Sequence, residues 1–151
     1  MMPASKSVRP VHFLLVEDDE DHAGLISRAL RDNRVANTVS HVVNGEQAMA
    51  FVNRHSPYED ADRPDVILLD LNLPRMDGHE VLAAIKSDPD LCSIPVVVLT
   101  TSHADADRSR AYSAHANSYL VKPLNFESFQ ALVQELKMYW TVWNEPAPAT
   151  A

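Results

Sequence analysis

The chain has 151 residues, of which 46% are hydrophobic and 23% are charged, and its formal net charge is −8. This length and composition are typical of one globular domain and exclude a disordered chain. The acidic balance argues against a general binder of nucleic-acid phosphates. Its single cysteine excludes an internal disulfide, and it has neither a signal peptide nor an apolar run of membrane-spanning length. We expect a cytoplasmic domain over residues 10–143, with flexible ends at 1–9 and 144–151.

Short apolar runs alternate with stretches of helical periodicity along the chain. In order, strands are predicted at residues 12–16, 38–42, 65–69, 96–99 and 118–121. Helices are predicted at about 21–31, after Asn44-Gly45, after Asp77-Gly78, at 104–114, and after Asn125 as their N-cap. Residues 55–64 are polar and predict a surface loop. Five successive strand–helix units indicate an α/β fold, a doubly wound parallel sheet with helices on both faces.

The last predicted helix is unusually aromatic towards its end. Trp140 and Trp143 are three residues apart and share a predicted face with Leu136 and Tyr139. Core packing explains part of this stripe, and an exposed surface for self-association is the alternative. A twofold homodimer is the commonest arrangement for such a surface. The sequence does not decide between the two interpretations.

Polar residues end four of the five predicted strands. In open α/β sheets, ligands bind beyond the carboxyl ends of the strands. The residues that reach this edge are four carboxylates, two hydroxyls and an ammonium: Glu17-Asp18-Asp19, Asp70, Thr100-Thr101 and Lys122. The second strand, which ends near Asn44, offers nothing comparable.

These residue types together suit the binding of a divalent cation and the transfer of a phosphoryl group. Clustered carboxylates repel one another unless a cation lies among them, and hard oxygen ligands suit Mg²⁺. A carboxylate beside Mg²⁺ can attack phosphorus and form an aspartyl phosphate. The metal and Lys122 can share the charge of the phosphoryl oxygens, and a threonine hydroxyl can donate to them. The residue types therefore predict a phosphoryl-accepting site at this edge of the sheet.

Four motifs give the chain a resemblance to the receiver domains of two-component response regulators. They are VEDD at 16–19, LLDLNLPRMDG at 68–78, VLTT at 98–101 and YLVKP at 119–123. The resemblance extends from about residue 11 to residue 140. It implies a flavodoxin-like (βα)5 fold with strand order 2-1-3-4-5. It also implies a phosphoacceptor signalling switch, not an enzyme, that assists its own phosphorylation and dephosphorylation.

The resemblance also implies a metal site. Asp70 would be the phosphoacceptor, and Asp18, Asp70 and the backbone carbonyl of Asn72 would bind Mg²⁺ directly. Glu17 would act on the metal through water. Asp19 has two interpretations, as a metal contact or as an acidic residue favoured by the dipole at the start of a helix.

Further roles follow for the fourth and fifth strands. Lys122 would pair with the phosphoryl group, and the Lys122–Pro123 peptide bond would be cis. Thr100 would be the switch hydroxyl, with Thr101 beside the site. Tyr119 would be the switch aromatic, although a core aromatic is the alternative.

The implied partner is a sensor histidine kinase that donates the phosphoryl group. A narrower resemblance, to the small regulators paired with bacterial phytochrome kinases, depends on RPDVILLDLNLP at 63–74, the long loop before it and the Tyr139-Trp140 ending. Because the chain ends soon after the last helix, output is expected by association, including a homodimer through the fourth helix, fifth strand and fifth helix, or by relay of the phosphoryl group onward. No nucleic-acid or membrane partner is expected. One departure from the family is Ala114-His115-Ala116, where many receivers have a small-Gly-small turn.

Two other functions compete with the receiver. A Mg²⁺-dependent phosphohydrolase would need a second acidic residue near its nucleophile and a cap, but Asn72 occupies the position two after Asp70. A binding module that only keeps the fold would not need the complete set of polar residues at the sheet edge. Asp77 is interpreted as structural, Cys92 as an inert thiol, and none of the seven histidines has a metal-ligand spacing.

Overall fold

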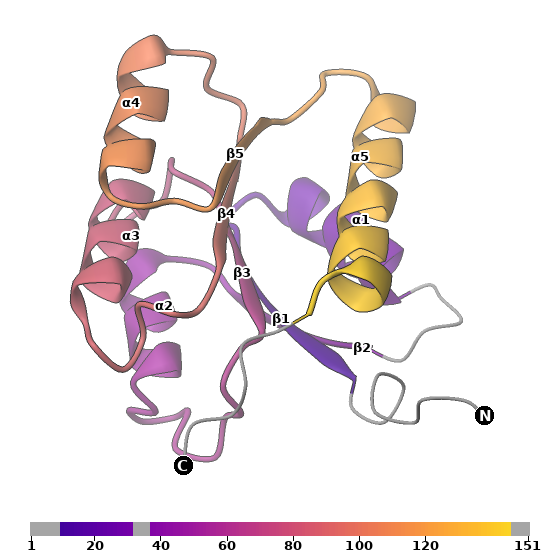
Figure 1. The fold of residues 1–151 in the computed structure, drawn as a ribbon. Helices are drawn as coiled ribbons and strands as arrows, with labels where there is room; N and C mark the ends of the chain where they lie inside the picture. Colours follow the sequence, from indigo (N-terminus) through magenta and orange to yellow (C-terminus); the bar gives the residue numbers. More distant parts are fainter. Residues whose placement is uncertain (1–9, 32–36, 146–151) are drawn as a thin grey trace.

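The structure, a computed structural model, describes residues 10–31 and 37–145 and contains one five-stranded parallel sheet. The strand order is β2-β1-β3-β4-β5 (Figure 1), with bounds β1 Val11–Val16, β2 Asn37–Val42, β3 Val66–Leu69, β4 Val96–Thr100 and β5 Ser118–Val121. The predicted order is confirmed, and each predicted strand agrees within one residue at either end. Of the flexible ends predicted at 1–9 and 144–151, residues 1–9 and 146–151 lie outside the described residues.

Helices cover both faces of the sheet, as predicted. Their bounds are α1 Glu20–Arg31, α2 Gly45–Val52, α3 Gly78–Ser87, α4 Asp105–Ser113 and α5 Phe126–Met138. α1 and α5 lie on one face, and α2, α3 and α4 lie on the other (Figure 1). After α5 the chain makes a π-helical turn, Tyr139–Trp143, so the predicted 3.6-residue spacing of the aromatic stripe ends at Met138. Among the described helices, none combines the length and apolar character needed to span a bilayer.

The core consists of two apolar clusters, one on each face of the sheet. Leu14 and Val16 of β1 belong to the cluster under α2 and α3, whereas Phe13 and Leu15 belong to the cluster under α1 and α5. Every residue of β3 and β4 is buried, which explains why both strands form continuous apolar runs in the sequence. Because all four strand pairs are parallel, the carboxyl ends of the strands lie at one edge of this buried sheet.

Side-chain caps begin several of the described helices, among them α3 and α5. Asp77 accepts a hydrogen bond from the Glu80 N–H, and Glu80 accepts one from the Asp77 N–H, forming a capping box at α3. Asn125 Oδ1 accepts from the Ser128 N–H at 3.0 Å and caps α5. The structural role predicted for Asp77 and the N-cap predicted at Asn125 are confirmed.

Two turns differ from what the resemblance implies. Among the described residues, the cis peptide bond is Ser56–Pro57, and the cis isomer predicted at Lys122–Pro123 is wrong. The two isomers of an X–Pro bond differ little in free energy, so the surrounding structure rather than the residue pair selects one. His115, before β5, has φ 70°, a left-handed conformation that glycine adopts without steric cost. The turn therefore keeps a glycine-like geometry with a less suitable residue.

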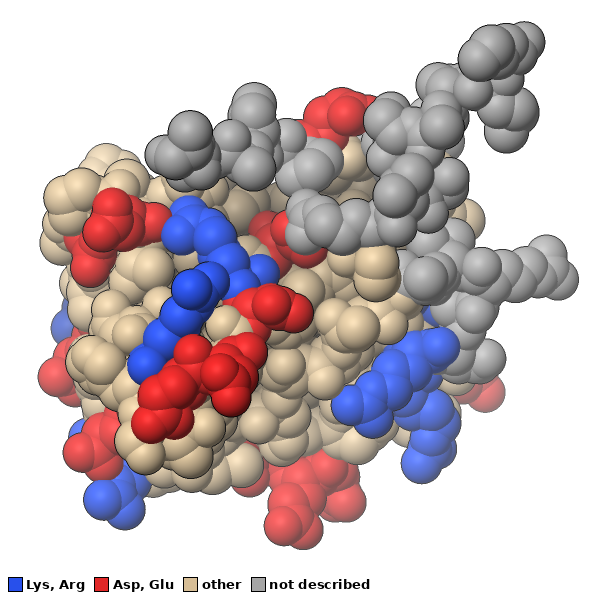
Figure 2. All heavy atoms as spheres, turned by 90° about the horizontal axis from the view of Figure 1, so that it is seen from below, with Lys and Arg blue, Asp and Glu red and all other residues tan. Residues whose placement is uncertain are grey.

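Acidic and basic side chains lie next to each other on the face seen from below in Figure 2. The described part of this face has no broad basic surface, in a chain whose net charge is −8.

Candidate functional site

Four strands deliver polar side chains to the same edge of the sheet. Glu17 and Asp18 directly follow β1, Asp70 follows β3, Thr100 is the last residue of β4, and Lys122 follows β5. The parallel register pairs the last residues of β1 with those of β3, and the last residues of β4 with those of β5. The fold thus places these predicted residues at one edge, as the sequence implied.

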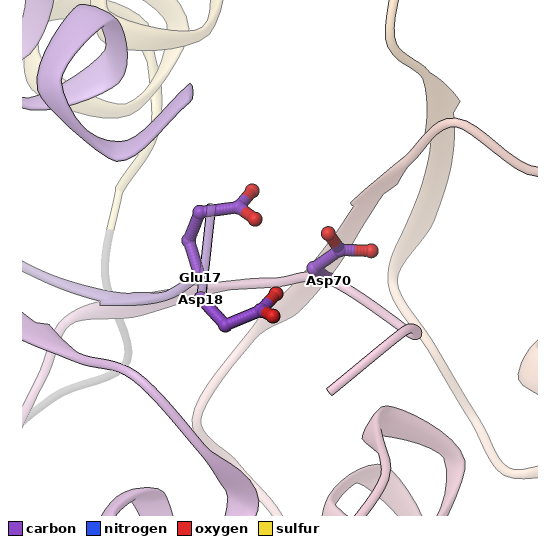
Figure 3. Close-up of side chains that lie close together, drawn as sticks. All are labelled: Glu17, Asp18 and Asp70. Atoms are coloured by element: carbon purple, nitrogen blue, oxygen red, sulfur yellow. The ribbon is translucent and has the colours of Figure 1, made fainter. Parts of the chain in front are cut away.

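Three carboxylates gather at the centre of this edge. One oxygen atom each from Glu17, Asp18 and Asp70 lies within 4.8 Å of the others (Figure 3). Glu17 is 1% exposed and Asp70 is 8% exposed, while Asp18 is open to solvent. Carboxylate oxygens with room for water on one side are a suitable donor set for a hard divalent cation. In the described part of the chain, no histidine belongs to a cluster of this kind.

Lys122 supplies the positive charge of the site. Its Nζ donates to Glu17 Oε1 at 2.5 Å and to Asp70 Oδ2 at 3.2 Å, and its side chain is 2% exposed. The third contact of Nζ is His22 Nδ1 at 2.9 Å, from the first turns of α1. The buried ammonium therefore joins three elements of the fold.

The pKa of Glu17 shows that the positive charge of Lys122 does not compensate for the burial and the negative charge of the carboxylates. Burial raises the pKa of Glu17 to about 7, and the neighbouring charge of Asp70 raises it too. The hydrogen bond and the charge of Lys122 lower this pKa but do not compensate fully. A divalent cation among the three carboxylates would favour their ionised forms, so the residues present fit a bound metal.

The backbone after β3 orients Asp70. The Asn72 N–H donates to Asp70 Oδ1 at 3.2 Å. Gly78 lies so close behind that a Cβ atom there would be 2.3 Å from the Asp70 carbonyl oxygen. Only glycine allows this approach of α3 to the loop. The role predicted for the backbone carbonyl of Asn72 stays a prediction.

Thr100 and Tyr119 both contact Ser102, in the loop between β4 and α4. The Ser102 N–H donates to Thr100 Oγ1 at 3.4 Å, and Thr100 is fully buried. The Tyr119 hydroxyl donates to the Ser102 carbonyl oxygen at 3.1 Å. Burial raises the pKa of Tyr119, and the hydrogen bond to Ser102 lowers it in part. Tyr119 is buried in this arrangement, with its ring in the core cluster under α2 and α3.

A hydrogen-bonded group that the sequence did not reveal continues from Ser102. Asp107 of α4 accepts from the Ser102 hydroxyl at 2.6 Å, and its other oxygen lies 3.0 Å from His79 Nε2. The hydrogen bond from Ser102, followed by that from His79, lowers the pKa of Asp107. We call Ser102, Asp107 and His79 the α4 anchor. It connects the first turn of α3 to α4 and to the loop that follows Thr100.

Two open interpretations become clearer in the structure. Asp19 Oδ1 accepts from the N–H groups of Asp21 and His22, which corresponds to the helix-start role rather than to the carboxylate cluster. Trp140 packs against the core cluster under α1 and α5 and lies edge-on to Tyr139, with ring centroids 5.1 Å apart. The side chain of Trp143 lies outside the described residues.

Several known proteins are similar to this chain in sequence. Residues 13–134 match the family described as response regulator receiver domain. The probable methanogenesis regulatory protein FilR2 of Methanothrix harundinacea is 48% identical, over 93% of this chain and 90% of its own. Response regulator Rcp1 of Synechocystis is 42% identical, over 91% of this chain and 93% of its own.

Solved structures agree with these relatives. The phosphorylated cyanobacterial phytochrome response regulator RcpA superposes with a TM-score of 0.90 at 41% identity, covering 93% of this chain and 100% of that one. The Mn²⁺-bound form of Rcp1 superposes with a TM-score of 0.89 at 41% identity, covering 92% of this chain and 100% of that one.

Proposed function

The chain belongs to the response regulator receiver family, and we propose that Asp70 is its phosphoacceptor and a sensor histidine kinase its phosphoryl donor. Phosphoacceptor signalling is general for this family, so the protein is a signalling switch. The observation that carries the choice of Asp70 is its pairing with the buried Lys122 inside a cluster of three carboxylates.

In the proposed transfer, a carboxylate oxygen of Asp70 attacks the phosphorus of a phosphohistidine on the kinase. The new O–P bond forms as the N–P bond breaks, and the electron pair returns to the imidazole of the kinase. Lys122 Nζ lies 3.2 Å from Asp70 Oδ2, which is close enough for the ammonium to donate to the phosphoryl oxygens and stabilise their negative charge during transfer. The Asn72 N–H keeps the other carboxylate oxygen oriented.

We propose Mg²⁺ as the cation of this site. Asp18, Asp70 and the backbone carbonyl of Asn72 would bind it directly, and Glu17 would act through water. Its two charges would neutralise the carboxylates and the transferred oxygens. The raised pKa of Glu17 and the Mn²⁺-bound form of Rcp1 support a divalent cation here.

Thr100 and Tyr119 are proposed to pass the change outward. The Thr100 hydroxyl would donate to the new phosphoryl group, and its contact with Ser102 would carry the movement to the loop before α4. The Tyr119 hydroxyl donates to the carbonyl oxygen of the same Ser102, so a movement of this loop would also move the Tyr119 side chain or break its hydrogen bond. Such a switch is a shift between two populated states that phosphorylation biases by its differential contacts.

The proposed output is association through the surface of α4, β5 and α5, including a homodimer. β5 is the edge strand of the sheet, and an edge strand offers unpaired backbone groups. Tyr112 on α4 adds an aromatic side chain that is 49% exposed. A cytoplasmic location, where a kinase could reach Asp70, is part of this proposal.

A phytochrome-type kinase is the proposed donor class. The support is the similarity to RcpA, named as a phytochrome response regulator, over nearly the whole of both chains. FilR2 is as similar in extent and is named a probable methanogenesis regulatory protein, so the names of the relatives do not point to one common process. Transfer from a purified phytochrome-type kinase, compared with an unrelated histidine kinase, tests this choice.

Intact mass spectrometry tests the phosphoacceptor. The wild type, Asp70→Asn and Asp60→Asn are incubated with a small phosphodonor and Mg²⁺, and size-exclusion chromatography follows on the same samples. Asp60 is an exposed carboxylate in the loop before β3 and serves as the matched control. We expect one Mg²⁺-dependent phosphoryl group on the wild type and on Asp60→Asn, and none on Asp70→Asn. Uptake by Asp70→Asn, or none by the wild type, contradicts the proposal.

A further inference from the structure

His22 is the contact of Lys122 to which the proposed function gives no role. Its Nδ1 lies 2.9 Å from Lys122 Nζ, although 100 positions separate the two residues. The imidazole ring packs edge-on against Phe129 of α5, with centroids 5.5 Å apart and planes at 76°. Its side chain is 33% exposed, and Asp19 Oδ2 lies 3.8 Å from the same nitrogen. The ring therefore sits between the active-site ammonium and the packing of α1 on α5.

The chemistry of the two groups fixes the direction of this hydrogen bond. An ammonium has three donors and no acceptor, so Nδ1 must accept. His22 is then neutral, with its proton on Nε2. Glu17, Asp70 and His22 use the three donors of Lys122, and His22 is the one of these three partners that is not a carboxylate.

We propose that His22 is a positioning residue for Lys122, which holds the ammonium between Glu17 and Asp70 for phosphoryl transfer. This inference rests on the proposed function, because it deepens the role of Lys122 there. Without the acceptor on α1, Nζ has two carboxylate partners and can turn away from Asp70. A carboxylate at position 22 would compete with Asp70 for the ammonium, whereas a neutral acceptor orients it without that competition.

Two substitutions separate this role from simple packing. His22→Asn keeps an acceptor oxygen near the place of Nδ1 but removes the ring that packs on Phe129. His22→Phe keeps a ring of similar shape but removes the acceptor. We expect the rate of phosphoryl uptake from a small phosphodonor to fall about tenfold in His22→Phe and to stay within about threefold of the wild type in His22→Asn.

A second measurement does not depend on phosphorylation. The ¹⁵N resonances of the wild-type ring should show the proton on Nε2. The Lys122 ammonium signal should exchange with water about as slowly in His22→Asn as in the wild type, and faster in His22→Phe. Equal rates and equal ammonium exchange in His22→Phe and the wild type would overturn the inference, as would a larger loss in His22→Asn. A wild type that takes up no phosphoryl group contradicts the proposed function instead, and the ammonium exchange still decides the role of His22.

Discussion

The helices α1 and α4 both follow strands of the same sheet, but different contacts hold them. α1 buries four side chains between the sheet and α5: Ala23, Ile26, Ala29 and Leu30. α4 buries one, Ala111. At the start of α1, Asp19 accepts hydrogen bonds from the N–H groups of Asp21 and His22, whereas Ala104, before α4, provides no side-chain cap.

The α4 anchor takes the place of apolar packing. Asp107 bonds to Ser102 and to His79, and Ser102 in turn contacts Thr100 and Tyr119. A helix held by a few polar contacts moves at a lower free-energy cost than one held by buried apolar area. If Asp70 accepts a phosphoryl group as proposed, the comparison predicts that the change is expressed through α4, while α1 keeps its place and carries His22.

The largest expected effect is on α1. Ile26→Ala should lower the free energy of unfolding by about 2–5 kcal/mol, because Ile26 is fully buried and the substitution leaves a cavity. Tyr112→Ala removes a larger side chain from α4, but Tyr112 is 49% exposed, so its loss should stay below about 1 kcal/mol. Urea denaturation of both variants makes the measurement. Equal losses would show that α4 depends on apolar burial as much as α1 does.

The next effect concerns the α4 anchor. Asp107→Ala should lower the free energy of unfolding by about 1–3 kcal/mol, because it leaves buried His79 without its partner. The amide protons of α4 should exchange about tenfold faster, while those of α1 stay unchanged. Native-state hydrogen exchange followed by NMR gives both values.

Arg108→Ala is the matched control for Asp107→Ala. It removes an ion pair to Asp105 on the exposed side of the same helix, which contributes little in water. α4 exchange should therefore stay near the wild-type rate. If Arg108→Ala and Asp107→Ala accelerate exchange equally, the anchor has no special part in holding α4.

The sequence was sufficient for the sheet edge because its signals are local. Each apolar run ends at a polar residue, and parallel strands bring those ends together, so the proximity of Asp70 to Lys122 follows from the topology. The N-cap at Asn125 and the capping residue Asp77 are local in the same way.

The contacts of the histidines were not predictable in this way. His22 meets Lys122 across 100 positions and His79 meets Asp107 across 28, and neither pair has a spacing that identifies it. Whether such side chains meet depends on the rotation of α1, α3 and α4 about their axes. The π-helical turn after Met138 was missed for a related reason, because its i→i+5 bonding, seen between Asn144 and Tyr139, leaves no periodic signal in five residues.

A smaller effect should come from the end of α4. His115→Gly should raise the free energy of unfolding by about 0.5–1 kcal/mol, because glycine adopts the left-handed φ of 70° without steric cost, offset in part by its greater freedom when unfolded. His115→Ala keeps a Cβ atom and should give no gain. Thermal or urea unfolding of the two variants measures the difference. No difference between them would mean that strain in this turn does not weaken α4.

The smallest expected effect concerns the pH dependence of the two helices. Both have a carboxylate whose pKa is lowered: Asp19 chiefly by the His22 N–H at the start of α1, and Asp107 chiefly by the Ser102 hydroxyl. For such a group, the stabilisation is complete above the ordinary aspartate pKa of about 3.9 and is lost as the pH falls through the lowered native value. Neither helix should therefore loosen through these groups between pH 7 and pH 5.

Ser102→Ala makes the distinction measurable. It should raise the pKa of Asp107 towards the ordinary range and leave that of Asp19 unchanged, because the donors to Asp19 are backbone groups of α1 itself. His79→Ala should raise the pKa of Asp107 by less, since its hydrogen bond is the smaller cause. Carboxyl ¹³C titrations of the three proteins follow both residues. A pKa of Asp107 that does not respond to Ser102→Ala would mean that α4 holds its own carboxylate as α1 does, and that the loop after Thr100 is not joined to α4 through this contact.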